Sequence, residues 1–511
     1  MNDVFFLAAR PGIPWYAYFS KGLQEWGFSC HAWLIEAEDV PIAEATGAFA
    51  SVEHLTEGFD RRNIGDVGRQ LELGRELEGR VGGAFLHREA AADRVLTGTQ
   101  FFELPPPQVR GRWQWPQLVA LAVHACRNVD ILLDKSDPVA IVGEVSYFMP
   151  RVIAALAASR SVPTLMPTGV FIGERRMSFL NGIDGQWDEC IALYRSYLHS
   201  GAIPQDHAKA AWAQMESIRF GRRPVLTAAT PRDHFPSLGD RFGWHRIANL
   251  LELAMETRNP SHHSSIRYQN STLVDPYFRA RRKLRRYRVR RIYEKIAARS
   301  LPEIPFVSYF LHVQPEVTVE GWSFHYQDQI ALIRNIAASL PANIALVVKE
   351  HGSQPGRDLS FYKEIMSIPG VAFVHHSVPN VIEGSLAVLT LVGTVTGEAM
   401  CLGKPVIMFG SVYYEHFAGV TKANSLEHLQ GLLADIENLP VPSEEVIQAA
   451  FAARHAASYT EPWAWTELAS GDYSLGEATL RALGERLTRI REAIVKSEKD
   501  KGHQAFPWVA G

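Results

Sequence analysis

The amino-acid sequence predicts an α/β protein with two Rossmann-like domains, whose parallel sheets face one another across a cleft and are joined by a helical connection. Its 511 residues suffice for about two or three domains of ordinary size. Short apolar strands alternate with helical segments over residues 1–215 and again over 301–440, and this alternation is typical of parallel sheets. Residues 216–300, between them, have a polar and basic helical pattern.

The first domain is predicted from apolar runs separated by turn residues. Strands are expected over residues 4–9, 29–35, 139–142 and 163–166, and helices over 16–26 and 150–160. Residues 60–130 are mostly helical in pattern. We interpret residues 1–215 as an N-terminal Rossmann-like domain.

The second domain has the clearer alternation of strands and helices. Strands are expected over residues 304–313, 344–348, 371–374, 386–392 and 406–409, and helices over 324–340, 361–368 and 398–402. Residues 441–511 are predicted to form C-terminal helices. In an open parallel sheet, ligands bind outside the carboxyl ends of the strands, so the segments that follow these strands are the first candidates for a site.

A loop rich in glycine and threonine follows the strand predicted over residues 386–392. It comprises Gly393, Thr394, Val395, Thr396, Gly397 and Glu398. Glycines let a backbone approach a ligand closely, and a helix N-terminus suits phosphate. The Glu398 carboxylate suits hydroxyl groups of a ribose or sugar instead. A capped tight turn without a ligand explains the same residues equally well.

Two further polar segments end predicted strands. Lys349 and His351 can bind a pyrophosphate, and His351 can also protonate a leaving group. Gln314 and Glu316 follow the first strand of the domain, where the Glu316 carboxylate can act as a base or a nucleophile. We therefore take Glu316 and His351 as catalytic candidates, with a structural pairing of Glu316 to His325 as the alternative.

The order and spacing of these three segments over residues 305–415 resemble the bacterial capsule polysaccharide biosynthesis family, which includes β-Kdo transferases. The resemblance implies a GT-B architecture and a glycosyltransferase of hexosyl or Kdo type, with a nucleotide-sugar donor such as CMP-Kdo. It implies a saccharide or glycolipid acceptor in capsule or other cell-surface polysaccharide, with residues 1–215 as the acceptor-side domain. By motif match, Gln314 and Glu316 would lie near the transferred sugar.

The same resemblance assigns the remaining motif residues to the donor. Lys349 and His351 would contact its phosphate, and Thr394, Thr396 and Glu398, beside Gly393, would contact its nucleotide. It also places the protein on the cytoplasmic face of the inner membrane. The donor is a substrate, so we expect no cofactor.

Composition narrows the class of protein. A net charge of −3 argues against nucleic-acid binding by the whole chain. The four cysteines are far apart and no paired acidic metal clamp is evident, so we expect neither a disulfide framework nor a metal site. No apolar run reaches the roughly 18 residues that span a bilayer. These features predict a cytoplasmic protein, peripheral at most on a membrane.

A basic cluster in the connecting segment is the strongest candidate for membrane contact. It includes Arg279, Arg281, Arg282, Lys283, Arg285 and Arg286. Such residues attract anionic lipid by about 1 kcal/mol each near the surface, although a solvated helix face explains them equally well.

Three other functions remain open from the sequence. A CDP-polyol phosphotransferase and a sugar-nucleotide epimerase would use the same kind of fold. A capsule-assembly protein without catalysis would bind no nucleotide.

Overall fold

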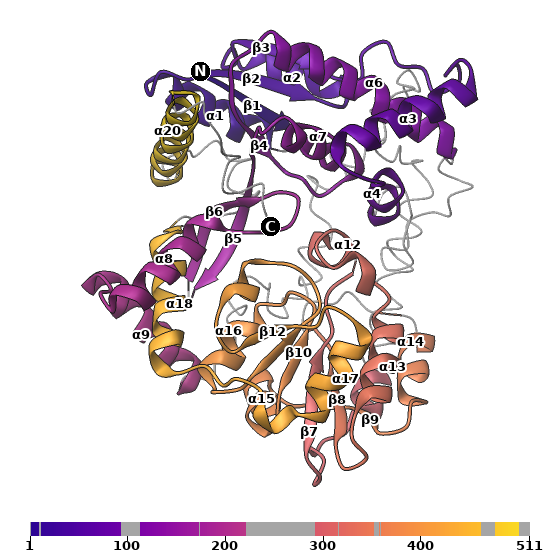
Figure 1. Ribbon diagram of the computed structural model, residues 1–511, viewed down its shortest axis with the longest axis vertical. Coiled ribbons are helices and arrows are strands. Elements are labelled where there is room, and N and C mark those ends of the chain that lie inside the picture. Colours follow the sequence, from indigo (N-terminus) through magenta and orange to yellow (C-terminus); the bar gives the residue numbers. More distant parts are fainter. Residues whose placement is uncertain are drawn as a thin grey trace, which may run out of the picture.

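The computed structural model describes residues 2–9, 12–93, 113–172, 174–220, 292–314, 316–351, 357, 359–460 and 476–499. These residues form two α/β domains, each built on its own β-sheet (Figure 1), as the sequence predicts. The basic cluster over residues 279–291 and most of the connecting segment lie outside the described residues.

The N-terminal sheet has the strand order β13-β6-β5-β4-β1-β2-β3. Its strands are β1 Asp3–Ala8, β2 Ser29–Leu34, β3 Ser51–His54, β4 Pro138–Gly143, β5 Thr164–Ile172, β6 Glu174–Asn181 and β13 Tyr459–Thr460. Strands β3, β2, β1, β4 and β5 run parallel, whereas β6 and β13 are antiparallel to their neighbours. The chain order reverses between β1 and β4, which creates a switch point at that place in the sheet.

Helices cover both faces of this sheet. They are α1 Ile13–Gln24, α2 Val40–Ala45, α3 Val67–Val81, α4 Leu86–Ala92, α6 Trp115–Asp134 and α7 Phe148–Ser159. The buried positions of α6 include Leu118, Leu121, Cys126 and Val129. This helical spacing directs one apolar stripe into the core that α6 shares with α7.

The C-terminal sheet is parallel throughout, with the order β12-β11-β10-β7-β8-β9. Its strands are β7 Phe306–Phe310, β8 Ala345–Lys349, β9 Val371–Phe373, β10 Val388–Thr390, β11 Val406–Met408 and β12 Val420–Lys422. The intervening helices are α12 Val317–Glu320, α13 Gln329–Ser339, α14 Leu359–Met366, α15 Val378–Gly384, α16 Val395–Cys401 and α17 Leu426–Ala434. All five residues of β7 are buried, as expected of a strand covered on both faces.

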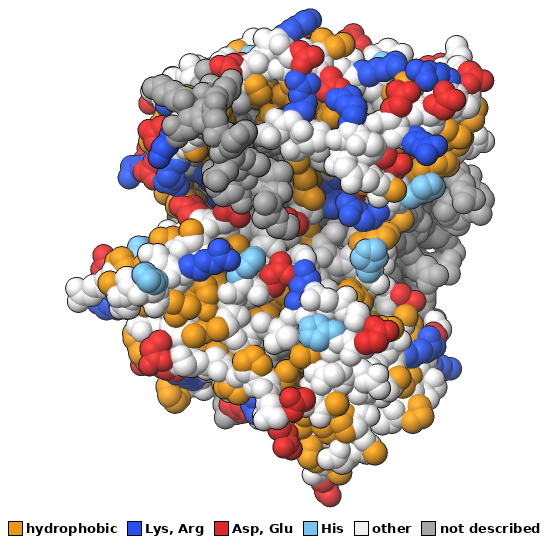
Figure 2. Space-filling model, in the orientation of Figure 1, with side chains coloured by type: hydrophobic (Ala, Val, Ile, Leu, Met, Phe, Trp, Pro, Cys, Tyr) orange, Lys and Arg blue, Asp and Glu red, His pale blue; other side chains and the backbone are white. Residues whose placement is uncertain are grey.

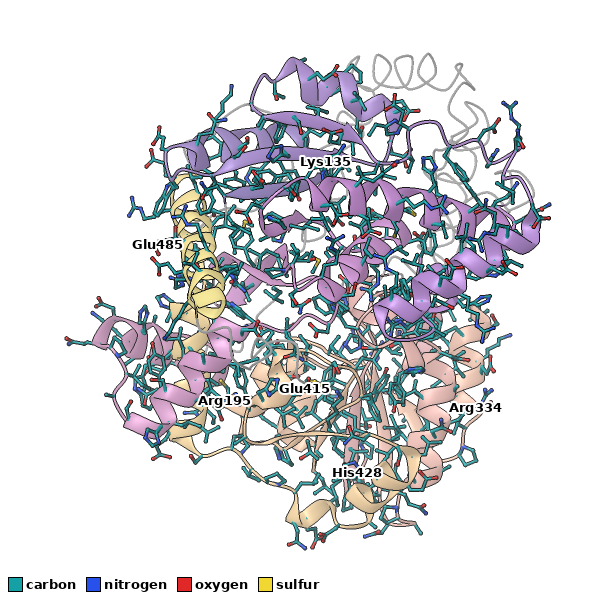
Figure 3. The ribbon with its side chains drawn as sticks, turned by 45° about the horizontal axis from the view of Figure 1, so that its top comes forward. Lys135, Arg195, Arg334, Glu415, His428 and Glu485 are labelled. Atoms are coloured by element: carbon teal, nitrogen blue, oxygen red, sulfur yellow. The ribbon has the colours of Figure 1, made fainter. Side chains whose placement is uncertain are left out.

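The end of the chain returns to the N-terminal domain. Helix α18 (Glu444–Ala456) packs on α8 (Asp188–Ser200) and α9 (Gln205–Arg219). Strand β13 then pairs with β6, and α20 (Glu477–Lys499) lies beside the N-terminal domain (Figures 1 and 3). Its Leu483 and Leu487 belong to the same core as Phe6 of β1. The fold is GT-B-like.

Trp322 makes one of the contacts between the two domains. Trp322, which follows α12, packs with Ile183 against a small cluster formed by Val145, Ala154 and Met166 of the N-terminal domain. Gly185 lies against the same ring, because a methyl group at position 185 would lie 2.8 Å from it. Val145 follows β4, and Trp322 lies in the segment after β7 and α12, so this contact joins segments that follow a central strand of each sheet.

Candidate functional site at the edge of the C-terminal sheet

The three polar segments predicted from the sequence converge in the structure. They follow β7, β8 and β10, which are neighbours in one parallel sheet. The chain order reverses between β7 and β10, and such a switch point opens a crevice at the carboxyl edge of a sheet. Helix α12, next after β7, lies on the side of its domain that faces the N-terminal domain (Figure 1). In Figure 2, Lys, Arg and His side chains lie along the waist between the domains together with Asp and Glu side chains.

A buried ion pair between Glu350 and Arg357 lies next to the end of β8. The Glu350 carboxylate accepts hydrogen bonds from Arg357 Nε at 2.9 Å and from the Tyr362 hydroxyl at 2.7 Å. It also accepts the backbone N–H of His351 at 2.8 Å. Arg357 is fully buried and stacks over the Phe361 ring at 4.6 Å. Glu350 therefore has a structural role, and its neighbours in the sequence, Lys349 and His351, are the candidates for ligand contact.

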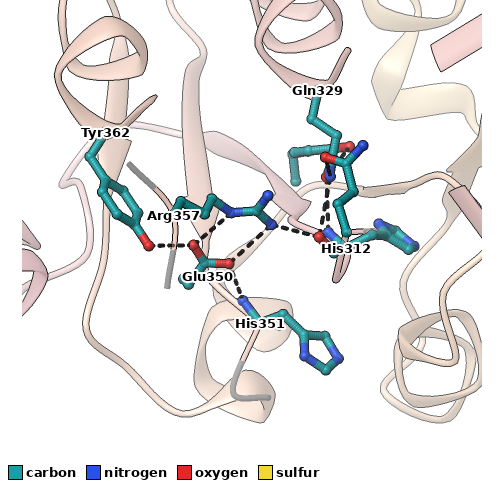
Figure 4. A network of polar contacts seen from close by, with 8 residues as sticks. His312, Gln329, Glu350, His351, Arg357 and Tyr362 are labelled. Carbon is teal, nitrogen blue, oxygen red and sulfur yellow. Dashed lines mark hydrogen bonds and ion pairs between the residues drawn. The ribbon is translucent and has the colours of Figure 1, made fainter. Parts of the chain in front are cut away.

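Lys349 and His351 are partly buried at the sheet edge. Burial lowers the pKa of the Lys349 ammonium, and the adjacent Glu350 charge opposes that shift. Burial likewise lowers the pKa of His351. Glu350 accepts the backbone N–H of His351, and the His351 ring points away from the Glu350–Arg357 pair (Figure 4). Within the described part of the chain, no side chain forms an ion pair with Lys349. A cation in this setting favours an anionic ligand.

The side-chain amide of Gln314 forms hydrogen bonds within the protein. The side chain is 4% exposed. Its Nε2 donates to the Gln327 carbonyl at 2.7 Å, and its Oε1 accepts from Gln329 Nε2 at 2.7 Å. Gln329 also accepts the backbone N–H of His312 at 2.9 Å. In this arrangement Gln314 supports the loop after β7, so its predicted contact with a donor stays a prediction.

Glu316 is exposed and lies where α12 begins. Its carboxylate accepts a hydrogen bond from the Thr318 hydroxyl at 3.0 Å. Its backbone N–H donates to the Glu320 carboxylate at 2.8 Å. The side chain is therefore accessible from solvent, as a catalytic group needs to be, and it is oriented by a neighbour within its own loop.

Glu320 is a member of this group that sequence reasoning missed. Its side chain is buried, and its Oε1 accepts a hydrogen bond from Gln314 Nε2 at 3.4 Å. Burial raises the pKa of Glu320 to about 7, with a smaller contribution from the Glu316 charge. The signal available in the sequence was its place four residues after Glu316, which on one helical turn puts the two residues side by side.

The loop after β10 packs more tightly than the sequence suggests. The backbone N–H of Gly393 donates to Thr390 Oγ1 at 3.1 Å. A methyl group at position 393 would lie 2.7 Å from that oxygen and 3.0 Å from His312 Nε2. Glycine is thus required here by contacts within the protein, whether or not a ligand also approaches.

Helix α16 shields two of the predicted donor-binding residues. Thr394 is its partly exposed N-cap, whereas Thr396 is fully buried and Glu398 is 3% exposed. A methyl group on Gly397, between them, would lie 3.4 Å from Arg454 and 3.5 Å from Phe451 of α18. The helix spans only Val395–Cys401. Its first turn presents Thr394 at the edge, and the roles of Thr396 and Glu398 toward a nucleotide stay predictions.

Two further observations concern metals and membranes. In the residues that the structure describes, no group of three or more His, Cys, Asp and Glu side chains could hold a metal ion. The four cysteines are buried and unpaired with one another. No helix among the described residues combines the length and the apolar character needed to cross a bilayer.

Comparison with known proteins gives structural likenesses at low identity. No family model matches the chain, and no curated protein matches its sequence. A β-Kdo 2,7 transferase, KpsC of Thermosulfurimonas dismutans, is similar with 12% identity and a TM-score of 0.29, over 64% of this chain and 80% of that one. A UDP-GlcNAc 2-epimerase of Neisseria meningitidis is similar with 10% identity and a TM-score of 0.24, over 89% and 98%. Likenesses at these identities do not transfer an activity, so function rests on the residues of the site.

Proposed function

We propose that this protein is a glycosyltransferase that moves a sugar from a nucleotide-sugar donor to a capsule or other cell-surface polysaccharide, or to its lipid acceptor. One observation carries the proposal. Three polar loops, with Glu316, His351 and Thr394 partly or fully exposed, meet at the carboxyl edge of the C-terminal sheet. That edge faces a second α/β domain through the contact between Trp322 and the cluster around Val145. Two facing domains provide one surface for a donor and another for an acceptor.

The donor phosphates are assigned to Lys349 and His351. An ammonium group favours phosphate by charge, and the imidazole can donate a hydrogen bond to a phosphate oxygen or a proton to the leaving nucleotide. The rigid Glu350–Arg357 pair supports this assignment, since it fixes the backbone from which both side chains project. Thr394 adds a hydroxyl donor on the neighbouring loop.

Catalysis is assigned to Glu316. The carboxylate takes the proton from the acceptor hydroxyl as that oxygen attacks the anomeric carbon, while the bond to the nucleotide phosphate breaks. Its exposure and its place in the segment that leads to Trp322 support the assignment. CMP-Kdo is one donor to test, and attachment to anionic membrane through Arg279, Arg281, Arg282, Lys283, Arg285 and Arg286 is a further part of the proposal.

The test is turnover of a panel of sugar nucleotides, with release of the free nucleotide followed by mass spectrometry. A glycosyltransferase releases a nucleotide from one donor class, and an acceptor glycan gains the mass of the sugar. An isomerised donor without release would favour an epimerase. Activity restricted to a CDP-polyol would favour a polyol-phosphate transferase. Absence of any binding or turnover over the whole panel would contradict the proposal.

A further inference from the structure

We infer that His312 is a positioning residue that holds the Gly393 loop, the loop of Lys349 and His351, and the loop of Gln314 in one fixed geometry. This inference rests on the proposed function for its catalytic meaning. The contacts themselves do not depend on that function. His312 follows β7, the strand between β8 and β10, so it stands between all three loops.

The imidazole of His312 holds the Gly393 loop. The backbone N–H of Val392 donates to His312 Nε2 at 3.4 Å, and Thr390 Oγ1 lies 3.3 Å from the same nitrogen. The Thr390 oxygen in turn accepts the backbone N–H of Gly393 at 3.1 Å. Two consecutive backbone amides of the loop are thus tied to one ring nitrogen, the first directly and the second through a hydroxyl.

The backbone of His312 holds the other two loops. Its carbonyl accepts a hydrogen bond from Arg357 Nη2 at 2.5 Å, and Arg357 is the partner of Glu350 (Figure 4). Its N–H donates to Gln329 Oε1 at 2.9 Å, while Gln329 Nε2 holds Gln314 at 2.7 Å. These contacts of His312 therefore end on residues that fix each of the three loops.

The protonation state of the ring suits this task. Burial lowers the pKa of His312 to about 3, and the charges of His351 and Arg357 act in the same direction. The ring is therefore neutral near pH 7. Because Nε2 accepts the Val392 N–H, the ring proton is on Nδ1. The buried Thr390 hydroxyl can then donate to Nε2 while it accepts from Gly393.

A pair of substitutions separates this role from simple space filling. Glutamine places an amide oxygen near the position of Nε2, whereas asparagine reaches only the position of Nδ1. In His312→Gln the Val392 and Gly393 amides should keep their slow hydrogen exchange. In His312→Asn both should exchange faster, and nucleotide affinity should fall about tenfold, the effect of one ordinary hydrogen bond. Equal exchange and affinity in the two variants would overturn the inference.

A second pair of substitutions, at Thr390, tests the same network if His312→Asn does not fold. Thr390→Val removes the hydroxyl and keeps the volume, and Thr390→Ser keeps the hydroxyl. We expect faster exchange of the Gly393 amide in the valine variant alone. Unchanged exchange in Thr390→Val would contradict the network. Hydrogen exchange is measured without a ligand. If the wild-type protein binds no nucleotide, the proposed function is contradicted, and the exchange rates of the variants still test the role of His312.

Discussion

The backbone N–H of Glu316 donates to the buried carboxylate of Glu320 at 2.8 Å, so the buried carboxylate holds the backbone from which the exposed Glu316 side chain projects. Glu320 also accepts from the Gln314 amide, so it joins both polar residues of the loop after β7. The charge on Glu320 therefore bears on the geometry of the candidate catalytic group.

The stability of the protein should depend on pH through Glu320. Its pKa is raised from an ordinary 4.5 to about 7 by burial, so the folded state binds this proton more tightly than the unfolded chain does. That stabilisation is complete below pH 4.5 and is lost as the pH rises through about 7, by up to about 3 kcal/mol. In Glu320→Gln this loss should be absent. Thermal unfolding of the wild type and of Glu320→Gln from pH 5 to 8 tests this prediction. The same dependence of stability on pH in both proteins would contradict it.

Turnover should depend on the charge of Glu316. Glu316→Gln keeps the shape and removes the base, so it should fold, bind the donor normally and lose about 10²–10⁴-fold in turnover. Thr318→Val is the matched control, since it removes only the hydroxyl that contacts Glu316 Oε2. We expect a small effect from it. Near-native turnover in Glu316→Gln would move the search for the base to Glu144, which follows β4 in the opposite domain.

Nucleotide affinity should depend on the Lys349 ammonium. Lys349→Ala should weaken binding by about 10–150-fold, the range for hydrogen bonds to charged groups. Lys363 on α14 serves as a control, because Lys363→Ala changes the net charge equally at an exposed position on a helix. Calorimetric titration with the preferred nucleotide measures both. Equal loss in the two variants would show a general charge effect and no specific phosphate contact.

The stability of the protein should fall when a side chain is added at Gly185, in the contact between the domains. Its φ of 71° disfavours any side chain, and a methyl group there would also meet the Trp322 ring at 2.8 Å. Gly201 has a φ of 64°, and a methyl group added at position 201 would have no heavy atom within 4 Å. Gly201→Ala should therefore lose about 1 kcal/mol from backbone strain alone, and Gly185→Ala clearly more. Equal losses on thermal unfolding would mean that Trp322 does not pack firmly on this loop.

Much of the C-terminal domain could be predicted, because buried parallel strands are continuous apolar runs with polar residues at their ends. Each of the three polar loops was placed after the correct strand for this reason. Their contacts could not be predicted, since Gln314 depends on Gln329 and Glu350 on Arg357, and no local pattern links these partners. The burial of Thr396 and Glu398 was missed for the same reason, because α18 packs against α16 from the far end of the chain.

The N-terminal domain was harder to predict. Strand β3 is short and only partly buried, so its apolar signal is weak. Strand β13 comprises only Tyr459–Thr460, and its partner β6 lies far away in the sequence. Pairing at such a separation depends on tertiary structure and not on the local sequence.

The central claim is that the donor binds at the edge of the C-terminal sheet, and a hydrogen-exchange footprint of the bound nucleotide tests it most directly. The nucleotide that most raises the thermal stability is added at about a hundred times its Kd, which stabilises the folded state by about 2.7 kcal/mol. Exchange should slow in peptides that contain Lys349 and His351 and in those that contain Gly393 and Thr394. Protection confined to the N-terminal domain, or no protection at saturation, would contradict the account.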